Sequence, residues 1–128
     1  MKNIAYHFFL AGVVSVTLGM VWGIQMSATG DHRLSAAHAH LNLIGWATFA
    51  LFGVYYLMTP AAARSRLAAV HLALALGGLV LIVPGIVMAL SERGDLLAKL
   101  GSVLTLASML VFLVTVLRHG FGQGGRTA

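Results

Sequence analysis

Histidine is the residue type in this chain whose chemistry most needs an explanation, because the sequence around it is strongly apolar. Six histidines occur among 128 residues, of which 59% are hydrophobic and 9% are charged. A polar ring inside an apolar segment must find a partner, so ionisable residues in such segments are candidates for a functional site. Imidazole nitrogen is also a ligand for haem iron, copper and zinc. The histidines are therefore the first candidates for a binding site.

The positions of these residues along the apolar runs divide them into two groups. The outer group is His32, His38 and His40, and the inner group is His7, His71 and His119. His40 and His71 each lie about four residues into a run from opposite ends, which separates them by roughly 18 Å in depth. Two axial ligands of one iron must be only about 4 Å apart. No outer histidine is therefore expected to share a metal with an inner one.

His38 and His40 form the most suggestive pair. Two positions correspond to about 200° around a helix, so their rings should point to nearly opposite faces and serve two sites. If the helix begins only at Leu41, an extended His-Ala-His segment could instead turn both rings inward. Asn42 is a further buried polar residue whose amide could fix a ring or bond across helices. A structural alternative keeps His38 as an interfacial polar residue and His40 as a hydrogen-bond partner of another helix.

We expect His40 to be the principal metal or cofactor ligand and His38 to supply a second contact. His32, Met20 and His71 are weaker candidates for metal ligands. The chain has no cysteine, which excludes thiolate ligands, disulfides and thiol nucleophiles. No acid lies within an apolar run, and no phosphate loop or serine, histidine and acid constellation is present. Hydrolytic catalysis is therefore not indicated.

The elements that must position these side chains are transmembrane helices. A helix needs about 20 apolar residues to cross a bilayer, and the sequence contains runs of that length. They are Ile4 to Met26, Ala36 to Met58, Leu67 to Leu90 and Leu96 to Leu117. Pro60 should end the second helix, and Pro84 should kink the third. The sequence predicts an all-α membrane protein, with a four-helix transmembrane domain over residues 1–119 and a disordered cytoplasmic tail over residues 120–128.

The charged residues predict the orientation of these helices. One side carries only basic residues, namely Lys2, Arg64, Arg66, Arg118 and Arg126. The other side carries Arg33, Arg93 and Lys99 together with the acids Asp31, Glu92 and Asp95. Basic residues favour the cytoplasmic side, so both termini are expected in the cytoplasm of a bacterial-type inner membrane. The net charge of +5 lies at helix ends rather than on one surface stripe, so no nucleic-acid partner is expected.

The segment from His38 to Pro60 resembles the histidine-bearing helices of the large catalytic subunit of haem-copper oxidases and nitric oxide reductases. The second helix of that family has a similar pattern, matched here by His40, Asn42, Leu43, Trp46, Gly53, Tyr55, Tyr56 and Pro60. In the family this histidine is an axial ligand of the low-spin haem. The tenth helix has a His-x-His pair that His38 and His40 match, and there the two rings face two haems.

The resemblance implies a haem b protein that acts in electron transfer or binds nitric oxide or oxygen, with Asn42 and Trp46 beside the haem. The family subunit has about twelve helices in three arcs of four, so a homotrimer joined through the second helix would resemble it. Electron transfer would also need a redox partner. The copper-binding histidines of the family have no counterpart in this chain, which argues against catalytic gas reduction and leaves enzymatic activity open.

Two further hypotheses come from other classes of protein. The histidines could bind copper or zinc, and Met20 and Met26 are suited to reduced copper. Alternatively, the chain could be a structural subunit of a respiratory complex in which the histidines are only hydrogen-bonded. The three hypotheses differ in whether the purified protein contains haem, another metal or no cofactor.

Overall fold

The structure, a computed structural model, describes residues 3–123 and contains helices but no strands within that range. Four spans are long and apolar enough to cross a membrane, namely Ile4–Thr29, Ser35–Met58, Arg66–Leu90 and Leu96–His119. Each coincides with a run predicted from the sequence, and the first continues past Met26 to Thr29. The all-α, four-helix membrane architecture is thereby confirmed.

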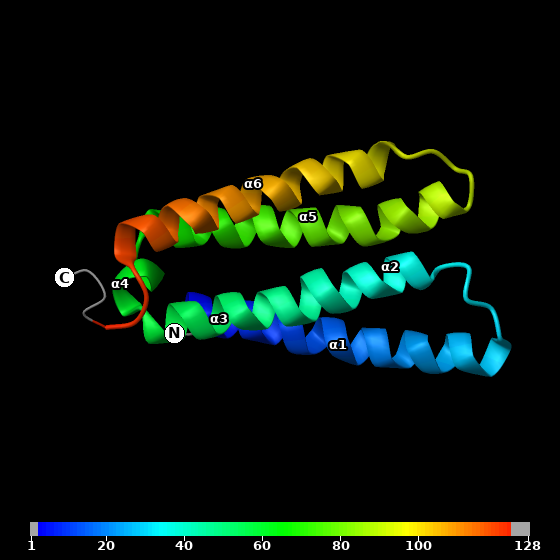
Figure 1. The fold of residues 1–128 in the computed structure, drawn as a ribbon, viewed down its shortest axis with the longest axis horizontal. Helices are drawn as coiled ribbons and strands as arrows, with labels where there is room; N and C mark the ends of the chain where they lie inside the picture. The colour runs from blue at the N-terminus through cyan, green and yellow to red at the C-terminus, as the bar shows by residue number, and fades with distance from the viewer. Residues whose placement is uncertain (1–2, 124–128) are drawn as a thin grey trace.

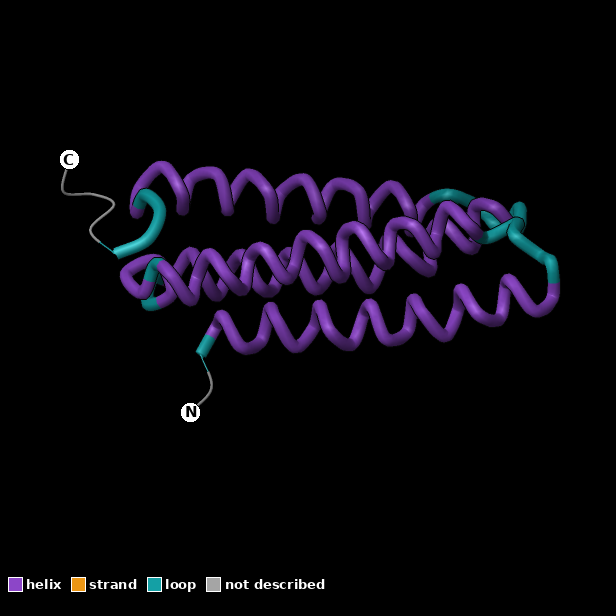
Figure 2. Tube along the Cα trace, turned by 60° about the horizontal axis from the view of Figure 1, so that its bottom comes forward, coloured by secondary structure: helices purple, strands orange, loops and turns teal. Residues whose placement is uncertain are grey.

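The four spans form two helical hairpins that lie side by side (Figure 1). The first hairpin pairs α1 (Ile4–Thr29) with a span composed of α2 (Ser35–His40), η1 (Leu41–Thr48) and α3 (Phe49–Met58), and the second pairs α5 (Arg66–Leu90) with α6 (Leu96–His119). The short helix α4 (Pro60–Ala63) joins them. The first and last residues that the structure describes lie at one end of the bundle, and the loops within the two hairpins lie at the other (Figures 1 and 2).

Glycines allow the helices of each hairpin to approach closely. A Cβ atom added to Gly53 of α3 would lie 3.1 Å from both Ala5 O and Phe9 N of α1. A Cβ atom on Gly101 of α6 would lie 2.5 Å from Ile82 N of α5. Small residues are the usual means of close helix contact in a bilayer. Gly53 and Gly101 are therefore points of close helix contact in the two hairpins.

The core lies between the hairpins, in the half of the bundle that is nearer the termini. Phe8, Phe49, Phe52 and Tyr56 are buried there, and the rings of Phe52 and Phe112 are 4.6 Å apart. Large aliphatic side chains instead cover the outer surface, as expected where the solvent is lipid. Examples are Leu51, Leu106 and Leu117, which are 69%, 61% and 76% exposed.

The two prolines and the C-terminal segment differ in their effects on the helices. Pro60 is the first residue of α4, a position where its missing N–H group costs nothing. Pro84 lies inside α5, which continues to Leu90.

The residues that follow α6 are hydrogen-bonded to the second span. The Tyr55 hydroxyl donates to Gly120 O at 2.8 Å, and Gly122 N donates to Thr59 Oγ1 at 2.8 Å. The first residues of the expected tail therefore bind the bundle, and residues 124–128 lie outside the described part.

Candidate histidine sites

The second span changes its helical form immediately after His40. α2 includes both His38 and His40, so the helical arrangement holds and the extended His-Ala-His alternative does not. From Leu41 to Thr48 the backbone is a π-helix, and the Thr48 hydroxyl donates to Leu43 O at 2.8 Å. π-Helical segments are rare in proteins, and those that occur often lie at functional sites. The sequence had predicted an ordinary α-helix throughout, since residue types do not signal this change of hydrogen-bond register.

His38 fastens α2 to α1. Its Nε2 atom lies 2.9 Å from Gly19 O of α1, and a carbonyl oxygen can only accept, so Nε2 carries a proton. The ring makes an edge contact with Trp22 at a centroid distance of 5.9 Å. The side-chain amide nitrogen of Asn42, one turn further along, lies 3.2 Å from the same Nε2 atom. Because a protonated Nε2 cannot accept a hydrogen bond, the two groups are in contact but form no second hydrogen bond. The Asn42 amide, which was expected to fix a ring or to bond across helices, therefore lies beside the His38 ring at the interface between α1 and the second span.

Trp46 lies on the same side of the second span. It packs against α1, where an added Cβ on Gly12 would lie 3.4 Å from the indole, and its ring centroid is 6.2 Å from that of Phe9. Residues four positions apart lie on one face of a helix, so His38, Asn42 and Trp46 follow one another along the α1 interface. The structure does not include His40 in that row.

His40 has a different partner and a different environment. Its Nδ1 atom lies 2.7 Å from Ala36 O, four residues earlier in the same helix. Because the carbonyl can only accept, Nδ1 carries the proton and Nε2 keeps its lone pair. The side chain is partly exposed. Metal-binding histidines usually donate their second ring nitrogen to an acceptor such as a backbone carbonyl, and His7 and His119 make the same bond to the carbonyl four residues earlier.

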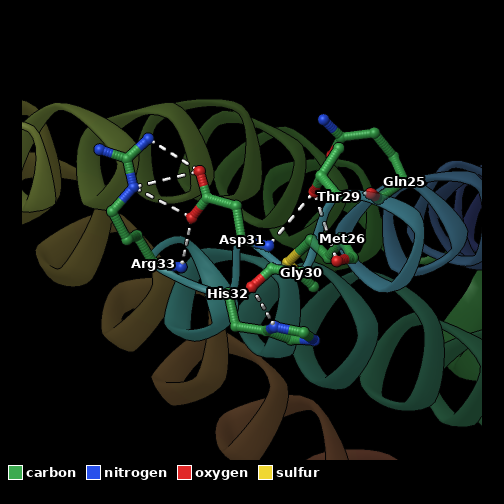
Figure 3. A network of polar contacts seen from close by, with 7 residues as sticks. All are labelled: Gln25, Met26, Thr29, Gly30, Asp31, His32 and Arg33. Carbon is green, nitrogen blue, oxygen red and sulfur yellow. Dashed lines mark hydrogen bonds and ion pairs between the residues drawn. The ribbon is translucent and has the colours of Figure 1, made fainter.

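The other outer candidates lie apart from these two rings. His32 is in the exposed loop after α1, with Nδ1 3.3 Å from Gly30 O, and Figure 3 shows its ring directed away from the ion pair of Asp31 and Arg33. Hydrogen bonds from Arg33 lower the pKa of the exposed Asp31 carboxyl to about 2. Met20 is 66% exposed on α1.

Sequence reasoning underrated His71. Its side chain is fully buried, and its Nδ1 atom lies 2.9 Å from the Tyr56 hydroxyl. The rings of Phe8, Phe52 and Phe112 surround it at centroid distances of 4.7, 4.3 and 5.1 Å. A usable signal was present, because Tyr56 ends one span and His71 begins the next, which places both at a similar depth.

Within residues 3–123, no three histidine, aspartate, glutamate or cysteine residues form a group that could hold a metal ion. No protein-family profile, no characterised protein and no solved structure matches the chain. The fold defines a multi-pass membrane protein of four spans. Its function must be argued from the histidines themselves.

Proposed function

We propose that this protein binds haem b in the membrane through His40 and uses it for electron transfer or for binding a small gas such as nitric oxide or oxygen. The observation that carries the proposal is the hydrogen bond of 2.7 Å between His40 Nδ1 and Ala36 O. It leaves the Nε2 lone pair free for iron, and it orients the ring without any help from a ligand. The resemblance of the segment from His38 to Pro60 to ligand-bearing helices supports the same assignment.

His38 is the weaker candidate for the axial ligand, because its ring already joins two helices. Its protonated Nε2 is committed to Gly19 O, and the ring edge packs against Trp22. Binding iron through Nε2 would break the bond to α1. His38 is thus better suited to holding α2 in place, or to a second contact through its other nitrogen.

The residues around His40 fit a haem better than a bare metal ion. A bare ion would need several protein ligands, and no group of three occurs among the described residues. A haem supplies four ligands of its own and needs only one or two from protein. Its apolar faces also suit the aliphatic neighbours of His40, of which Leu43 is 64% exposed.

A second copy of the chain is the simplest source of a sixth ligand. His40 of each copy is partly exposed on the second span, so two such spans in contact could place two histidines on one iron. We favour a homotrimer joined through this span. Two histidine ligands would point to electron transfer with a redox partner, whereas an open position on the iron would point to gas binding.

Charge asymmetry supports the proposed placement in a bacterial inner membrane with the termini in the cytoplasm. The start of α1 and the end of α6 lie at the end of the bundle that carries Arg64, Arg66 and Arg118, and the loops of the opposite end carry all three acids. Basic residues favour the cytoplasmic side. The proposed haem would then lie in the half of the bilayer away from the cytoplasm.

The test is a pyridine haemochrome spectrum of the detergent-purified protein and of two matched variants. His40→Ala should lose the b-type spectrum. His7→Ala should keep it, because His7 is bonded in the same way, with Nδ1 2.8 Å from Asn3 O, but lies at the other end of the bundle. A wild-type protein without a haem spectrum would refute the proposal. A copper or zinc content in place of iron would favour the metal-ion hypothesis.

A further inference from the structure

Tyr56 and His71 form a buried polar pair between the two hairpins. The Tyr56 hydroxyl and His71 Nδ1 are 2.9 Å apart, and the two residues are 1% and 0% exposed. Neither belongs to the proposed haem site, since α2 with His40 lies toward the opposite end of the bundle (Figure 1). A buried phenol beside an imidazole can transfer its proton to that ring when the phenol is oxidised.

The neighbouring tyrosine offers a natural comparison. Tyr55 is also buried, at 4% exposed, but its hydroxyl donates to the backbone carbonyl of Gly120 at 2.8 Å. A carbonyl accepts a hydrogen bond but is a very weak base, whereas a neutral imidazole can accept the proton itself. The two adjacent phenols therefore differ in one respect that matters for oxidation: Tyr56 has a hydrogen-bond partner that can accept its proton, and Tyr55 does not.

We propose that Tyr56 is a proton-coupled electron donor to a metal-centred one-electron oxidant, with His71 as its base. The oxidant takes one electron from the phenol and is reduced. The O–H bond of Tyr56 breaks, and its proton forms an N–H bond at His71 Nδ1. The products are a neutral tyrosyl radical and an imidazolium, and reduction of the radical returns the proton. This inference does not depend on the haem proposal.

The aromatic residues around His71 offset part of the cost of the charge that this step creates, since burial away from water and from any carboxylate disfavours an imidazolium. Phe8, Phe52 and Phe112 have ring centroids 4.7, 4.3 and 5.1 Å from the imidazole. A cation over the face of an aromatic ring and within about 6 Å of its centroid is attracted by the ring, and the tilted rings of Phe8 and Phe112 are the candidates for such a contact. The acids of the chain, Asp31, Glu92 and Asp95, all lie in or beside the loops at the other end. The same burial would shield the radical from water.

The experiment uses the Tyr6→Phe protein, because the chain has three tyrosines and this change leaves only Tyr55 and Tyr56. A light flash with ruthenium tris-bipyridine and persulfate generates the oxidant, and electron paramagnetic resonance detects the radical. Ring-deuterated tyrosine distinguishes a tyrosyl signal from that of a tryptophan. Adding Tyr55→Phe should leave the signal, whereas adding Tyr56→Phe should remove it. The reverse result, or equal signals from both variants, would overturn the proposal.

His71→Gln tests the role of the base. Glutamine can still hydrogen-bond to the phenol but cannot take its proton, so radical formation should slow on the order of a hundredfold, as for loss of a positioned general base. An unchanged rate in a folded His71→Gln protein would contradict the assignment of His71. If this variant does not fold, as judged by circular dichroism, the comparison of Tyr55 with Tyr56 decides alone.

Discussion

His38 and His40 lie on one helix, two residues apart, yet their rings bond to carbonyl groups of different helices. His38 Nε2 donates to Gly19 O of α1 at 2.9 Å, and His40 Nδ1 donates to Ala36 O of its own helix at 2.7 Å. One ring therefore holds two spans together, and the other, on a partly exposed side chain, keeps a lone pair on Nε2. This difference supports the proposed ligand role of His40 and a structural role for His38.

This difference predicts unequal effects on stability. His38→Ala removes a bond between helices and the contact with Trp22, so it should lower the free energy of unfolding by about 1 kcal/mol or more. His40→Ala removes only a bond within one turn and should cost less in protein stripped of any cofactor. Unfolding of the two variants in mixed detergent micelles measures both. Equal losses would contradict the assigned roles.

Two glycines should respond oppositely to the same substitution. Gly101→Ala places a methyl group 2.5 Å from Ile82 N, so α5 and α6 must separate, at a cost of about 1–3 kcal/mol. Gly77→Ala places the methyl group 3.7 Å from a flexible side-chain atom of Leu104. It should be neutral, or stabilising by up to about 1 kcal/mol, because alanine favours helix. Thermal unfolding in detergent would show whether the ranking holds.

The ion pair of Asp31 and Arg33, in the loop after α1, predicts a measurable change in the pKa of Asp31. Arg33 lowers the pKa of Asp31 from 3.8 to about 2, so Arg33→Gln should raise that pKa toward 3.8. Because the folded-state pKa is the lower one, any stabilisation from this pair is present at neutral pH and is lost as the pH falls toward 2. Both side chains are exposed to solvent, so the effect on stability should be small. Carboxyl titration by nuclear magnetic resonance would detect the shift, and an unchanged pKa would refute the role of Arg33.

Hydropathy alone was sufficient to predict the four spans, because a bilayer demands about 20 apolar residues for each crossing. The helical spacing of His38 and His40 likewise predicted that their rings would have different partners. The α1 side of the second span was less predictable, since the contact of His38 with Gly19 depends on how two helices align. The residue types from Leu41 to Thr48 do not predict that this segment is a π-helix.

His71 shows a second limit of sequence reasoning. The sequence places His71 appreciably inside a span, and places His7 and His119 at helix ends where water and phosphate groups satisfy them, but it does not indicate what surrounds the His71 ring. The structure encloses that ring with Tyr56 and phenylalanines from three different spans. Contacts between residues as far apart as Phe8 and Phe112 arise from the packing of the two hairpins, which apolar periodicity does not determine.

The central claim is that His40 is an axial ligand of haem b, and replacement of the ligand from solution tests it most directly. His40→Gly should lose most of its haem and its b-type optical bands. Added imidazole should restore both, because a free ring can occupy the space left by the side chain. Full haem retention in His40→Gly without imidazole, or a wild-type protein that binds no haem when reconstituted, would contradict the account.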